Sequence, residues 1–208
     1  MTSQPAFKRA DPDERRASLI AACARVLARD GAAGASVRAI ALEAGVSPGL
    51  IGHYFGGVDA LVAATYAQVE TQVAAALDAA VAAAGSDPRA RLEAYVCASL
   101  LPPIADSELL STWIAFWSLV RARPEIASLH DEQYGRFRAG LAALLAEAGV
   151  PAPALRRTAL AVTALVDGLW LELCLSPRTF GEGEAAAIAR GSLSALISTA
   201  RSAGSGNS

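Results

Sequence analysis

The chain has 208 residues, of which 53% are hydrophobic and 18% are charged, and its formal net charge is −2. This composition is typical of a folded chain with a buried core and excludes a disordered one. The apolar stretches without charge at 94–105 and 109–120 are shorter than the roughly 18 apolar residues of a membrane span, so we expect no membrane partner. The N-terminal sequence lacks the apolar segment of a secretory signal, which predicts a cytoplasmic protein.

Residues that bind metals or carry catalysis are few and scattered. Cys23, Cys97 and Cys174 are widely separated and have no close histidine partners, so we expect buried free thiols rather than disulfides or a zinc site. The two histidines, His53 and His130, are far apart, and the sequence has no nucleophile elbow and no phosphate-binding glycine loop. We therefore expect no enzyme activity, no cofactor and no bound metal.

Charge is unevenly distributed along the chain. Residues 1–57 carry seven Lys and Arg against five Asp and Glu, a net charge of +2, whereas the remainder has a net charge of −4. The first quarter is therefore the basic part, although a difference of this size is also typical of an ordinary solvated surface.

The first two expected helices end at glycine turns. Apolar residues recur at helical spacing over residues 13–30, and the dipeptide Asp30-Gly31 ends this pattern. Ser36 is expected to cap a second helix of about two turns, which ends where Gly45 supplies a left-handed turn.

A third short helix follows directly. Ser47 and Pro48 have the residue types of an N-cap and a first helical position, with GLIGHYF as the body of the helix. Six longer helices are expected after it, over residues 58–84, 87–101, 107–123, 124–148, 153–175 and 184–202, and Ser107 is expected to be the N-cap of the third of these. No segment alternates with the period of a strand, so the sequence predicts an all-α fold of about nine helices.

Two short helices joined by a glycine turn and packed on a preceding helix predict a helix-turn-helix, whose second helix enters the major groove of DNA. Ser36 and Ser47 lie at helix N-termini, where free amides and the positive end of the dipole attract phosphate. Gly49 and Gly52 remove side-chain bulk from the third helix, which allows close approach to base edges.

Three larger side chains supply further contacts in this interpretation. Arg38 can bind a guanine edge with two hydrogen bonds, and His53 and Tyr54 can donate to phosphates. Helix-turn-helix geometry also occurs in proteins that never touch DNA, and His53 is equally compatible with an ordinary surface histidine.

The stretch VSPGLIGHYFGGVDALVAATY, residues 46–66, resembles the signature of TetR-type transcriptional repressors. Residues 13–66 match the N-terminal domain of that family in order and spacing. The resemblance places Phe55 at a core position, and it implies a DNA-contacting set of Ser36, Arg38, Ser47, Pro48, Gly49, His53 and Tyr54. The family usually has a phosphate-binding lysine where this chain has Val58, so one backbone contact is in doubt.

Three segments extend the resemblance to the choline-responsive BetI-type repressors. SPGLIGHYFG is similar to the recognition helix of that subgroup, and TWIAFWSL and DGLWLELCLSP are similar to parts of its C-terminal domain. The resemblance implies a DNA-binding domain over residues 1–57 and an effector-binding and dimerisation domain over residues 58–208.

Aromatic residues mark a candidate effector cavity among the fifth to eighth helices. Trp113, Phe116 and Trp117 share one helical face, and Asp167 lies one turn from Trp170 in an otherwise apolar helix. A carboxylate in that setting must be exposed, paired or directed at a polar cavity. Indole faces together with a carboxylate suit a quaternary ammonium. These five residues are the candidates for binding it, with Tyr95 and Glu172 as supporting candidates.

Two alternatives remain for these residues. Aromatic stripes at helical spacing are also typical of an ordinary core, and Asp167 can equally cap or brace a dimer. The last two helices carry more apolar surface than one bundle needs, which predicts a homodimer through a four-helix interface. Its expected members are Leu160, Val162, Leu165, Leu169, Leu173, Ile188, Leu193, Leu196 and Ile197.

Together these features predict a ligand-responsive repressor that binds a pseudo-palindromic double-stranded operator as a homodimer. A small-molecule effector, with choline or another quaternary ammonium as the candidate, would shift the population to a state with lower operator affinity. One alternative is a regulator of efflux or catabolic genes that responds to a different apolar or cationic ligand. Another is a helical adaptor that binds only protein.

Overall fold

The computed structural model describes residues 11–205, and the side chains of residues 11–202. Nine α-helices and one 3₁₀ turn make up the secondary structure of this part of the chain, in agreement with the predicted all-α fold. Their bounds are α1 Pro12–Gly34, α2 Val37–Glu43, α3 Gly49–Phe55, α4 Val58–Ala83, α5 Pro88–Ala98, α6 Ser107–Val120, α7 Pro124–Glu147, α8 Ala152–Leu175, η1 Pro177–Thr179 and α9 Glu184–Ser205.

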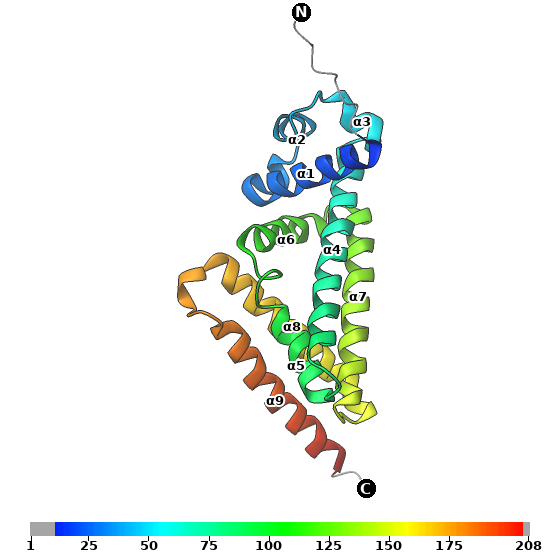
Figure 1. Cartoon of the computed structure of the whole chain (residues 1–208). Helices are drawn as coiled ribbons and strands as arrows, with labels where there is room; N and C mark the ends of the chain where they lie inside the picture. The colour runs from blue at the N-terminus through cyan, green and yellow to red at the C-terminus, as the bar shows by residue number, and fades with distance from the viewer. Residues whose placement is uncertain (1–10, 206–208) are drawn as a thin grey trace, which may run out of the picture.

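The first three helices form a compact head (Figure 1). The regular part of α1 ends where Gly31 adopts a positive φ of 68°, as the sequence predicts. The hydroxyl of Ser36 accepts a hydrogen bond of 3.2 Å from the amide of Ala39 and caps α2. Gly45 then takes the left-handed conformation, with φ of 65°, that lets α3 return across the end of α2.

The start of α3 differs from the prediction. The helix begins at Gly49, and Pro48 occupies the N-cap position with helical dihedral angles and no side-chain cap. The carbonyl oxygens of Ser47 and Pro48 accept hydrogen bonds of 3.1 and 3.2 Å from the amides of Leu50 and Ile51. Ser47 therefore contributes its backbone carbonyl to a tight first turn, and its hydroxyl does not cap the helix.

A similar one-residue shift occurs at α6. Ser107 is the first helical residue, and Asp106 is the N-cap. The carboxylate of Asp106 accepts hydrogen bonds of 2.9 and 3.3 Å from the amides of Glu108 and Leu109. The Asp106 carboxylate accepts hydrogen bonds from two amides and also interacts favourably with the helix dipole. This explains why Asp106, and not Ser107, is the N-cap.

The body lies below the head, with α4 and α7 side by side along its length and α9 along its outer edge (Figure 1). Helix α6 crosses beneath α1 and packs against it, and α4 also contacts α1. The hydroxyl of Thr112 on α6 bonds to the carbonyl of Glu108 and lies 3.4 Å from the carbonyl of Ala24 on α1. Helices α4 and α6 therefore connect the head with the body.

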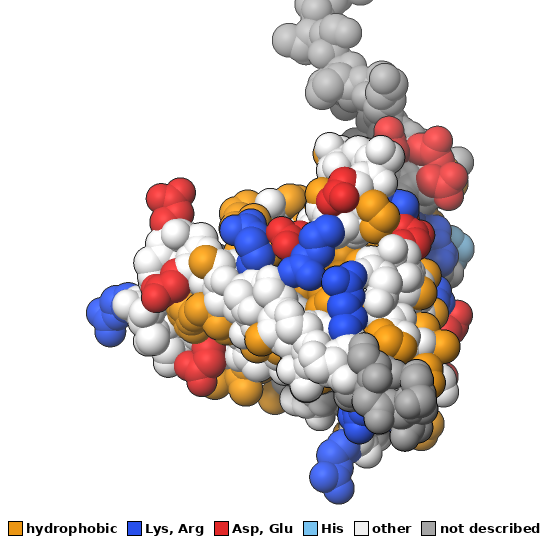
Figure 2. All heavy atoms as spheres, turned by 90° about the horizontal axis from the view of Figure 1, so that it is seen from below, with side chains coloured by type: hydrophobic (Ala, Val, Ile, Leu, Met, Phe, Trp, Pro, Cys, Tyr) orange, Lys and Arg blue, Asp and Glu red, His pale blue; other side chains and the backbone are white. Residues whose placement is uncertain are grey.

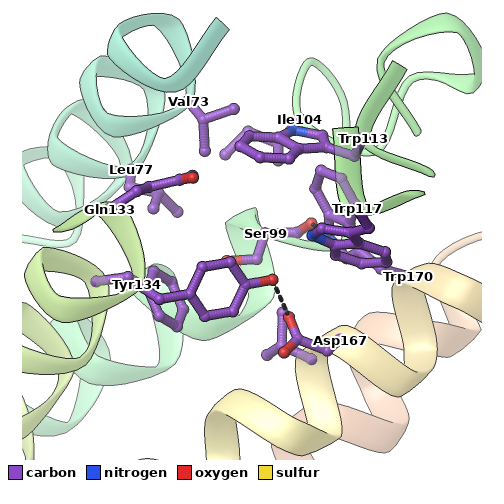
Figure 3. Close-up of a pocket in the computed structure, with 12 residues that line it drawn as sticks. Val73, Leu77, Ser99, Ile104, Trp113, Trp117, Gln133, Tyr134, Asp167 and Trp170 are labelled. Atoms are coloured by element: carbon purple, nitrogen blue, oxygen red, sulfur yellow. Dashed lines mark hydrogen bonds between the residues drawn. The ribbon is translucent and has the colours of Figure 1, made fainter. Parts of the chain in front are cut away.

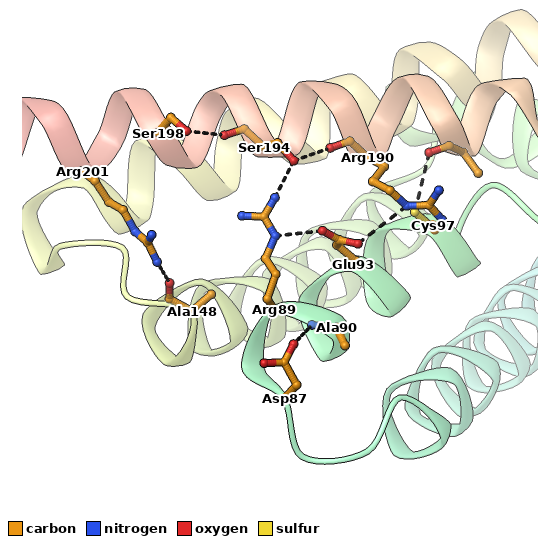
Figure 4. A network of polar contacts seen from close by, with 11 residues as sticks. Asp87, Arg89, Ala90, Glu93, Cys97, Ala148, Arg190, Ser194, Ser198 and Arg201 are labelled. Atoms are coloured by element: carbon orange, nitrogen blue, oxygen red, sulfur yellow. Dashed lines mark hydrogen bonds and ion pairs between the residues drawn. The ribbon is translucent and has the colours of Figure 1, made fainter.

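Polar contacts fasten α9 to the bundle (Figure 4). Arg89 on α5 pairs with Glu93 at 2.8 Å and donates a hydrogen bond of 2.5 Å to the hydroxyl of Ser194 on α9. Arg201, near the other end of α9, donates to the carbonyl of Ala148. These contacts hold one face of α9 on α5 and on the turn between α7 and α8.

The end of the body farthest from the head carries mixed charge. Figure 2 shows arginine side chains near the middle of this face, with acidic side chains beside them. A nucleic-acid-binding surface usually presents a continuous patch of positively charged side chains. This face therefore does not have the character of a second DNA-binding surface.

The cysteines are free thiols within the described residues. Cys23 and Cys97 are buried as predicted, and burial raises the pKa of the Cys23 thiol to about 11. Cys174 is only half-buried, because it lies near the C-terminal end of α8.

Helix α8 is the one described helix that is long and apolar enough, by length and composition, to cross a membrane. Core helices of soluble proteins pass the same test. Since α8 packs against α6, α7 and α9 in the bundle, its apolar character has a structural explanation here.

The expected dimer surface needs correction. Four of its predicted members lie in the core of the chain itself, because α8 and α9 pack against each other and α9 also packs against α5. These buried residues are Val162, Leu169, Leu193 and Ile197. The large apolar side chains that the described part of these two helices exposes are Leu160, Leu171, Leu175 and Ile188.

Candidate functional site

Helix α3 presents an exposed face with little side-chain bulk. Ile51 is fully buried and anchors the helix on the head, whereas Pro48, Gly49, Gly52 and His53 are exposed. A Cβ atom added at Gly49 or Gly52 would meet no other atom of the described chain within 4 Å. Packing within the chain therefore does not require these glycines, although each lowers helix stability by about 1 kcal/mol relative to alanine.

The C-terminal end of α3 is fixed to α1. The guanidinium of Arg16 lies 4.5 Å above the centre of the Phe55 ring and donates a hydrogen bond to the carbonyl of Tyr54. The ring of Tyr54 is half-buried and meets the exposed ring of His53 edge to face, with centroids 5.0 Å apart. Phe55 is also half-buried, so it packs on the core but is less enclosed than the predicted core position.

Arginines on the head fall into two groups. Arg25 and Arg29 on α1 pair with Glu43 on α2 at 2.7 and 2.8 Å, which braces the two helices against each other. Arg38 on α2 is exposed and makes no ion pair or hydrogen bond with the described residues. Its guanidinium is therefore available to an external partner.

A cavity of about 60 Å³ lies in the body (Figure 3). Helices α4, α6, α7 and α8 and the segment that connects α5 to α6 contribute to its wall, so α4 is an addition to the region that the sequence predicts. The lining residues are mostly aromatic and aliphatic: Val73, Leu77, Ser99, Ile104, Trp113, Trp117, Gln133, Tyr134, Phe137, Val166, Asp167 and Trp170.

Asp167 is the one acidic residue in this wall. Its carboxylate accepts a hydrogen bond of 3.0 Å from the hydroxyl of Tyr134 (Figure 3), and it forms no ion pair with a described residue. Burial raises the pKa of Asp167 to about 6, against the opposing effects of the Tyr134 bond and the positive charge of Arg138. The cavity therefore contains a carboxylate that is ionised at neutral pH and has no cationic partner.

The described residues contain no group of three or more His, Cys, Asp or Glu that could hold a metal ion. His130 lines a shallower pocket that adjoins the cavity and shares Trp117, Tyr134 and Asp167 with it. His53 lies on the head, far from the cavity.

Comparison with known proteins identifies the two parts of the chain. The model of bacterial regulatory proteins of the tetR family matches residues 19–65, and the model of the C-terminal domain of BetI-type transcriptional repressors matches residues 88–198. The chain is also 36% identical over 166 residues to the HTH-type transcriptional regulator BetI of Paraburkholderia phytofirmans, which covers 80% of this chain and 85% of the relative. The chain belongs to the TetR family and has a BetI-type repressor domain.

Solved structures agree with this membership. A transcriptional regulator from Pseudomonas aeruginosa is 39% identical, has a TM-score of 0.83 and covers 95% of this chain and 97% of its own. A transcriptional regulator from Saccharomonospora viridis, solved in complex with choline, has a TM-score of 0.70, 24% identity and coverage of 89% and 96%. The second likeness shows the fold alone.

Membership in the TetR family makes this protein a DNA-binding transcriptional regulator and not an enzyme. Of the predicted DNA-contacting residues, Ser36 caps α2, Arg38 lies on α2, and the others lie on α3 or on the turn before it; Tyr54 is the least exposed of them. Val58 begins α4 and is half-buried against the core, so the position where the family usually has lysine carries no charge here.

Four of the five predicted ligand-binding residues line the cavity of this TetR-family protein: Trp113, Trp117, Asp167 and Trp170. Phe116 does not. It is fully buried, and its ring packs 4.8 Å from that of Tyr66 on α4. Phe116 follows Trp113 by three residues, which corresponds to a rotation of about 300° around the helix axis. The Phe116 side chain therefore points to the side of α6 that faces α4.

The two supporting candidates have different positions. The ring of Tyr95 stacks on that of Phe137 with centroids 5.2 Å apart, and its hydroxyl donates a hydrogen bond of 3.2 Å to the Phe137 carbonyl oxygen. Tyr95 therefore supports a residue of the cavity wall. Glu172 is exposed and does not line the cavity.

Sequence reasoning missed the contribution of α7. Gln133, Tyr134 and Phe137 occupy one wall of the cavity, opposite α6 and α8. Tyr134 and Phe137 are three residues apart, which is the same aromatic spacing that marks α6. Their segment also contains many charged residues, however, and therefore resembles a solvated helix.

Proposed function

We propose that this TetR-family repressor binds a pseudo-palindromic operator as a homodimer in the cytoplasm and is released by a small quaternary ammonium such as choline. The observation that carries the proposal is the half-buried carboxylate of Asp167, which forms no ion pair with a described residue and lines the cavity together with three tryptophans. A quaternary ammonium is attracted to such rings by roughly 0.5 to 2 kcal/mol each, and the carboxylate adds a direct charge interaction.

Two further facts bear on this ligand class. The enclosed space beside Asp167 is small, at about 60 Å³, and it adjoins a wider pocket that shares Trp117, Tyr134 and Asp167 with it. A structural neighbour with the same fold is a complex with choline, and a relative that is 36% identical over 166 residues is a BetI regulator.

The cavity is connected to the head through α4 and α6. Trp113 and Trp117 line the cavity from α6, and Thr112 on the same helix approaches the carbonyl of Ala24 on α1. On α4, the hydroxyl of Tyr66 donates a hydrogen bond of 2.5 Å to Gln133, another residue of the cavity wall. A ligand that changes the position of either helix can therefore change the angle of the head, and a coupling of about 1 to 3 kcal/mol would alter operator affinity about 5 to 150-fold.

A homodimer would place two α3 helices on one operator. The exposed apolar residues of α8 and α9, Leu160, Leu171, Leu175 and Ile188, form the proposed interface. The two half-sites would then be on the order of 34 to 36 Å apart, or a multiple of that distance. At each half-site Gly49 and Gly52 would let the backbone approach the bases, with Arg38 at a base edge and Ser36, Ser47, Pro48, His53 and Tyr54 along the phosphates.

Operator binding by the full-length protein tests this function. A mobility-shift assay with intergenic DNA next to its own gene should give a retarded complex, which choline weakens. Arg38→Ala should lower operator affinity about tenfold or more, because a bidentate base contact contributes about 1 to 3 kcal/mol. Arg91→Ala, which removes an arginine of α5 that pairs with Glu147 at the end of α7, is the matched control and should leave affinity unchanged.

The same assay identifies the alternatives. A complex that forms but ignores choline would favour a regulator with a different ligand, and a thermal-shift screen of amines, fatty acids and aromatic compounds would then find it, since a ligand at 100 times its Kd adds roughly 2.7 kcal/mol of stability. No complex on any fragment, at low salt where phosphate contacts are strongest, would contradict repression and favour an adaptor.

A further inference from the structure

One ion pair joins the start of α4 to the connection between α6 and α7. Nη1 of Arg123 lies 2.6 Å from Oδ1 of Asp59. Asp59 is the second residue of α4, and residues 56–58 alone separate it from the end of α3. Arg123 ends the connection 121–123 and precedes α7, whose N-terminal end lies beside the upper part of α4, directly below the head (Figure 1). The pair therefore bridges the place where head and body meet.

The arginine end of this pair is enclosed by the chain. The side chain of Arg123 is 31% exposed, whereas that of Asp59 is 71% exposed. The Nη1 atom is itself buried and makes no regular hydrogen bond with the described residues, so the contact with Asp59 is an ion pair. Burial raises the pKa of the Cys23 thiol on α1, and a hydrogen bond with Thr65 and the charge of Arg123 oppose this change. The guanidinium thus lies within reach of both α1 and α4.

The connection that carries Arg123 is fastened at both ends. The amides of Ala122 and Arg123 donate hydrogen bonds of 3.0 and 2.9 Å to the carbonyl of Leu119, in the last turn of α6. The carbonyl of Arg123 accepts a hydrogen bond of 3.0 Å from the amide of Ala127, in the first turn of α7. A movement of the C-terminal end of α6 is therefore carried directly to Arg123.

The same connection also borders the effector side of the body. Val120 and Arg121 line the pocket that adjoins the cavity, together with Trp117 and Asp167. Arg123, two residues after Arg121, contacts α4 instead. One short segment thus contacts both the wall beside the proposed effector site and the first turn of α4.

A second ion pair joins the same two helices within the body. Arg136 on α7 lies 2.9 Å from Glu70 on α4. Glu70 follows Asp59 by eleven residues, or about 16 Å along the helix. This pair holds α4 to α7 without reaching the head, and it therefore provides a matched comparison.

We propose that Arg123 is a positioning residue for operator binding, which holds the head at one angle to the body through Asp59. A displacement of the α6–α7 connection by an effector then acts on the head through this pair. The inference rests on the proposed repressor function and adds the residue pair that transmits its signal. Because the pair is partly exposed, it accounts for a change of up to about fivefold in an equilibrium constant.

The spacing of the two half-sites tests the positioning role without any effector. One duplex carries the operator, and a second has one additional base pair between the half-sites, which moves them apart by about 3.4 Å and rotates them by about 35°. Full-length wild-type protein should prefer the first duplex in anisotropy titrations. Asp59→Asn and Arg123→Gln should each reduce this preference by about two- to fivefold, because a less firmly held head adapts to both duplexes.

The ratio of the two affinities separates positioning from simple charge effects. Removal of Asp59 takes a negative charge away from DNA and strengthens binding to both duplexes alike, which leaves their ratio unchanged. Arg123→Lys keeps the positive charge and should retain most of the preference. Arg136→Gln breaks the pair with Glu70 in the body and should retain all of it.

The response to choline tests the second half of the inference. In wild-type protein, saturating choline should raise the operator Kd. The ratio of the Kd with choline to the Kd without it should fall toward one, by up to about fivefold, in Asp59→Asn and Arg123→Gln. Calorimetry on the DNA-free variants should show that choline still binds, so that a lost response is not a lost ligand.

The outcomes separate this inference from the proposed function. An unchanged spacing preference in Asp59→Asn and Arg123→Gln, or a wild-type protein without any preference, would overturn the positioning role while repression stands. An equal loss in Arg136→Gln would overturn the assignment to the Asp59–Arg123 pair. A wild-type complex that ignores choline would remove choline as the effector, and the two duplexes would still test the pair. No complex on any fragment would overturn repression, and this inference with it. Asp59→Asn, at an exposed position, carries the test if Arg123→Gln does not fold.

Discussion

Tyr134 on α7 and Asp167 on α8 are joined by a hydrogen bond of 3.0 Å across the cavity wall. Burial raises the pKa of Asp167 to about 6, although the Tyr134 bond and the charge of Arg138 oppose that change. The carboxylate is therefore ionised at neutral pH while it remains largely desolvated. Such a group binds a cation more strongly than a solvated carboxylate does, because less water has to be displaced.

We expect the affinity for a quaternary ammonium to fall as the pH drops below about 6. The ligand does not titrate, so the change comes from protonation of Asp167, and about one pH unit below its pKa the Kd should be about tenfold higher. His130 in the adjoining pocket has a pKa lowered by burial, and its protonation at low pH acts in the same direction. Calorimetric titrations between about pH 5 and pH 8 measure this profile.

Two variants assign the profile to Asp167. Asp167→Asn should weaken binding and remove most of the pH dependence. Tyr134→Phe removes the hydrogen bond that favours the charged form, so the midpoint of the profile should move to higher pH. A wild-type affinity that stays constant over the whole range would contradict an ionised Asp167 as the cation-binding group.

Asp167→Asn should also stabilise the ligand-free protein near neutral pH. The pKa of Asp167 is higher in the folded than in the unfolded state, so the native state binds more protons and stability decreases as the pH rises from about 4 to 6. Asparagine carries no charge to desolvate and still accepts the bond from Tyr134. Denaturant unfolding near pH 7 should show a gain on the order of 2 kcal/mol that disappears near pH 4, and an equal gain at both would point to packing instead.

The head could be derived from the sequence because its determinants are local. Gly31 and Gly45 adopt the positive φ values that their turn positions require, and Ser36 caps α2 through an amide three residues away. These relationships span a few residues and depend little on the rest of the fold. Two helix starts were predicted one residue too early or too late: α3 begins at Gly49 and not at Pro48, and at α6 Asp106 and not Ser107 is the N-cap, because both are good caps.

The cavity could be derived only in part. The sequence indicated Trp113, Trp117, Asp167 and Trp170, because aromatic residues and a carboxylate stand out in apolar helices. It did not indicate the α7 wall, since only the packing of α7 against α4 and α8 directs its polar and aromatic residues inward. For the same reason, four residues of the expected dimer surface turned out to be buried within the chain itself. The sequence of an apolar helix does not show which neighbouring helix covers each of its faces.

Gly52→Ala should stabilise the free protein and weaken its binding to DNA. The added Cβ meets no atom of the described chain within 4 Å, so the helix gains about 1 kcal/mol of intrinsic propensity. On an operator the same methyl group would enter the space between α3 and the base edges. Thermal unfolding and operator titration by fluorescence anisotropy measure the two opposite effects.

Gly135→Ala is the control for this prediction. Gly135 lies in α7, is exposed and also has nothing within 4 Å of its added Cβ. It should give a similar gain in stability with unchanged operator affinity. If Gly52→Ala also left operator affinity unchanged, the exposed face of α3 would not be the surface that approaches the bases.

The exposed apolar residues of α8 and α9 should hold the dimer together. Leu160 and Ile188 are 40% and 41% exposed, and Leu171 and Leu175 are exposed as well, although the other large apolar side chains described on α8 and α9 are buried or half-buried. A charge at both positions would be desolvated in a dimer but would remain in water in a monomer. Leu160→Glu combined with Ile188→Glu should therefore convert the dimer to a monomer in sedimentation-velocity measurements.

Operator affinity should fall by about tenfold or more in this double variant, because each head then binds its half-site alone. Leu42→Glu is the control for the oligomeric state, since Leu42 is 82% exposed on α2 and lies outside the proposed interface. It should remain dimeric. A wild-type protein that sediments as a monomer at micromolar concentration, or a double variant that stays dimeric, would place the contact between subunits on another surface or remove it from the mechanism.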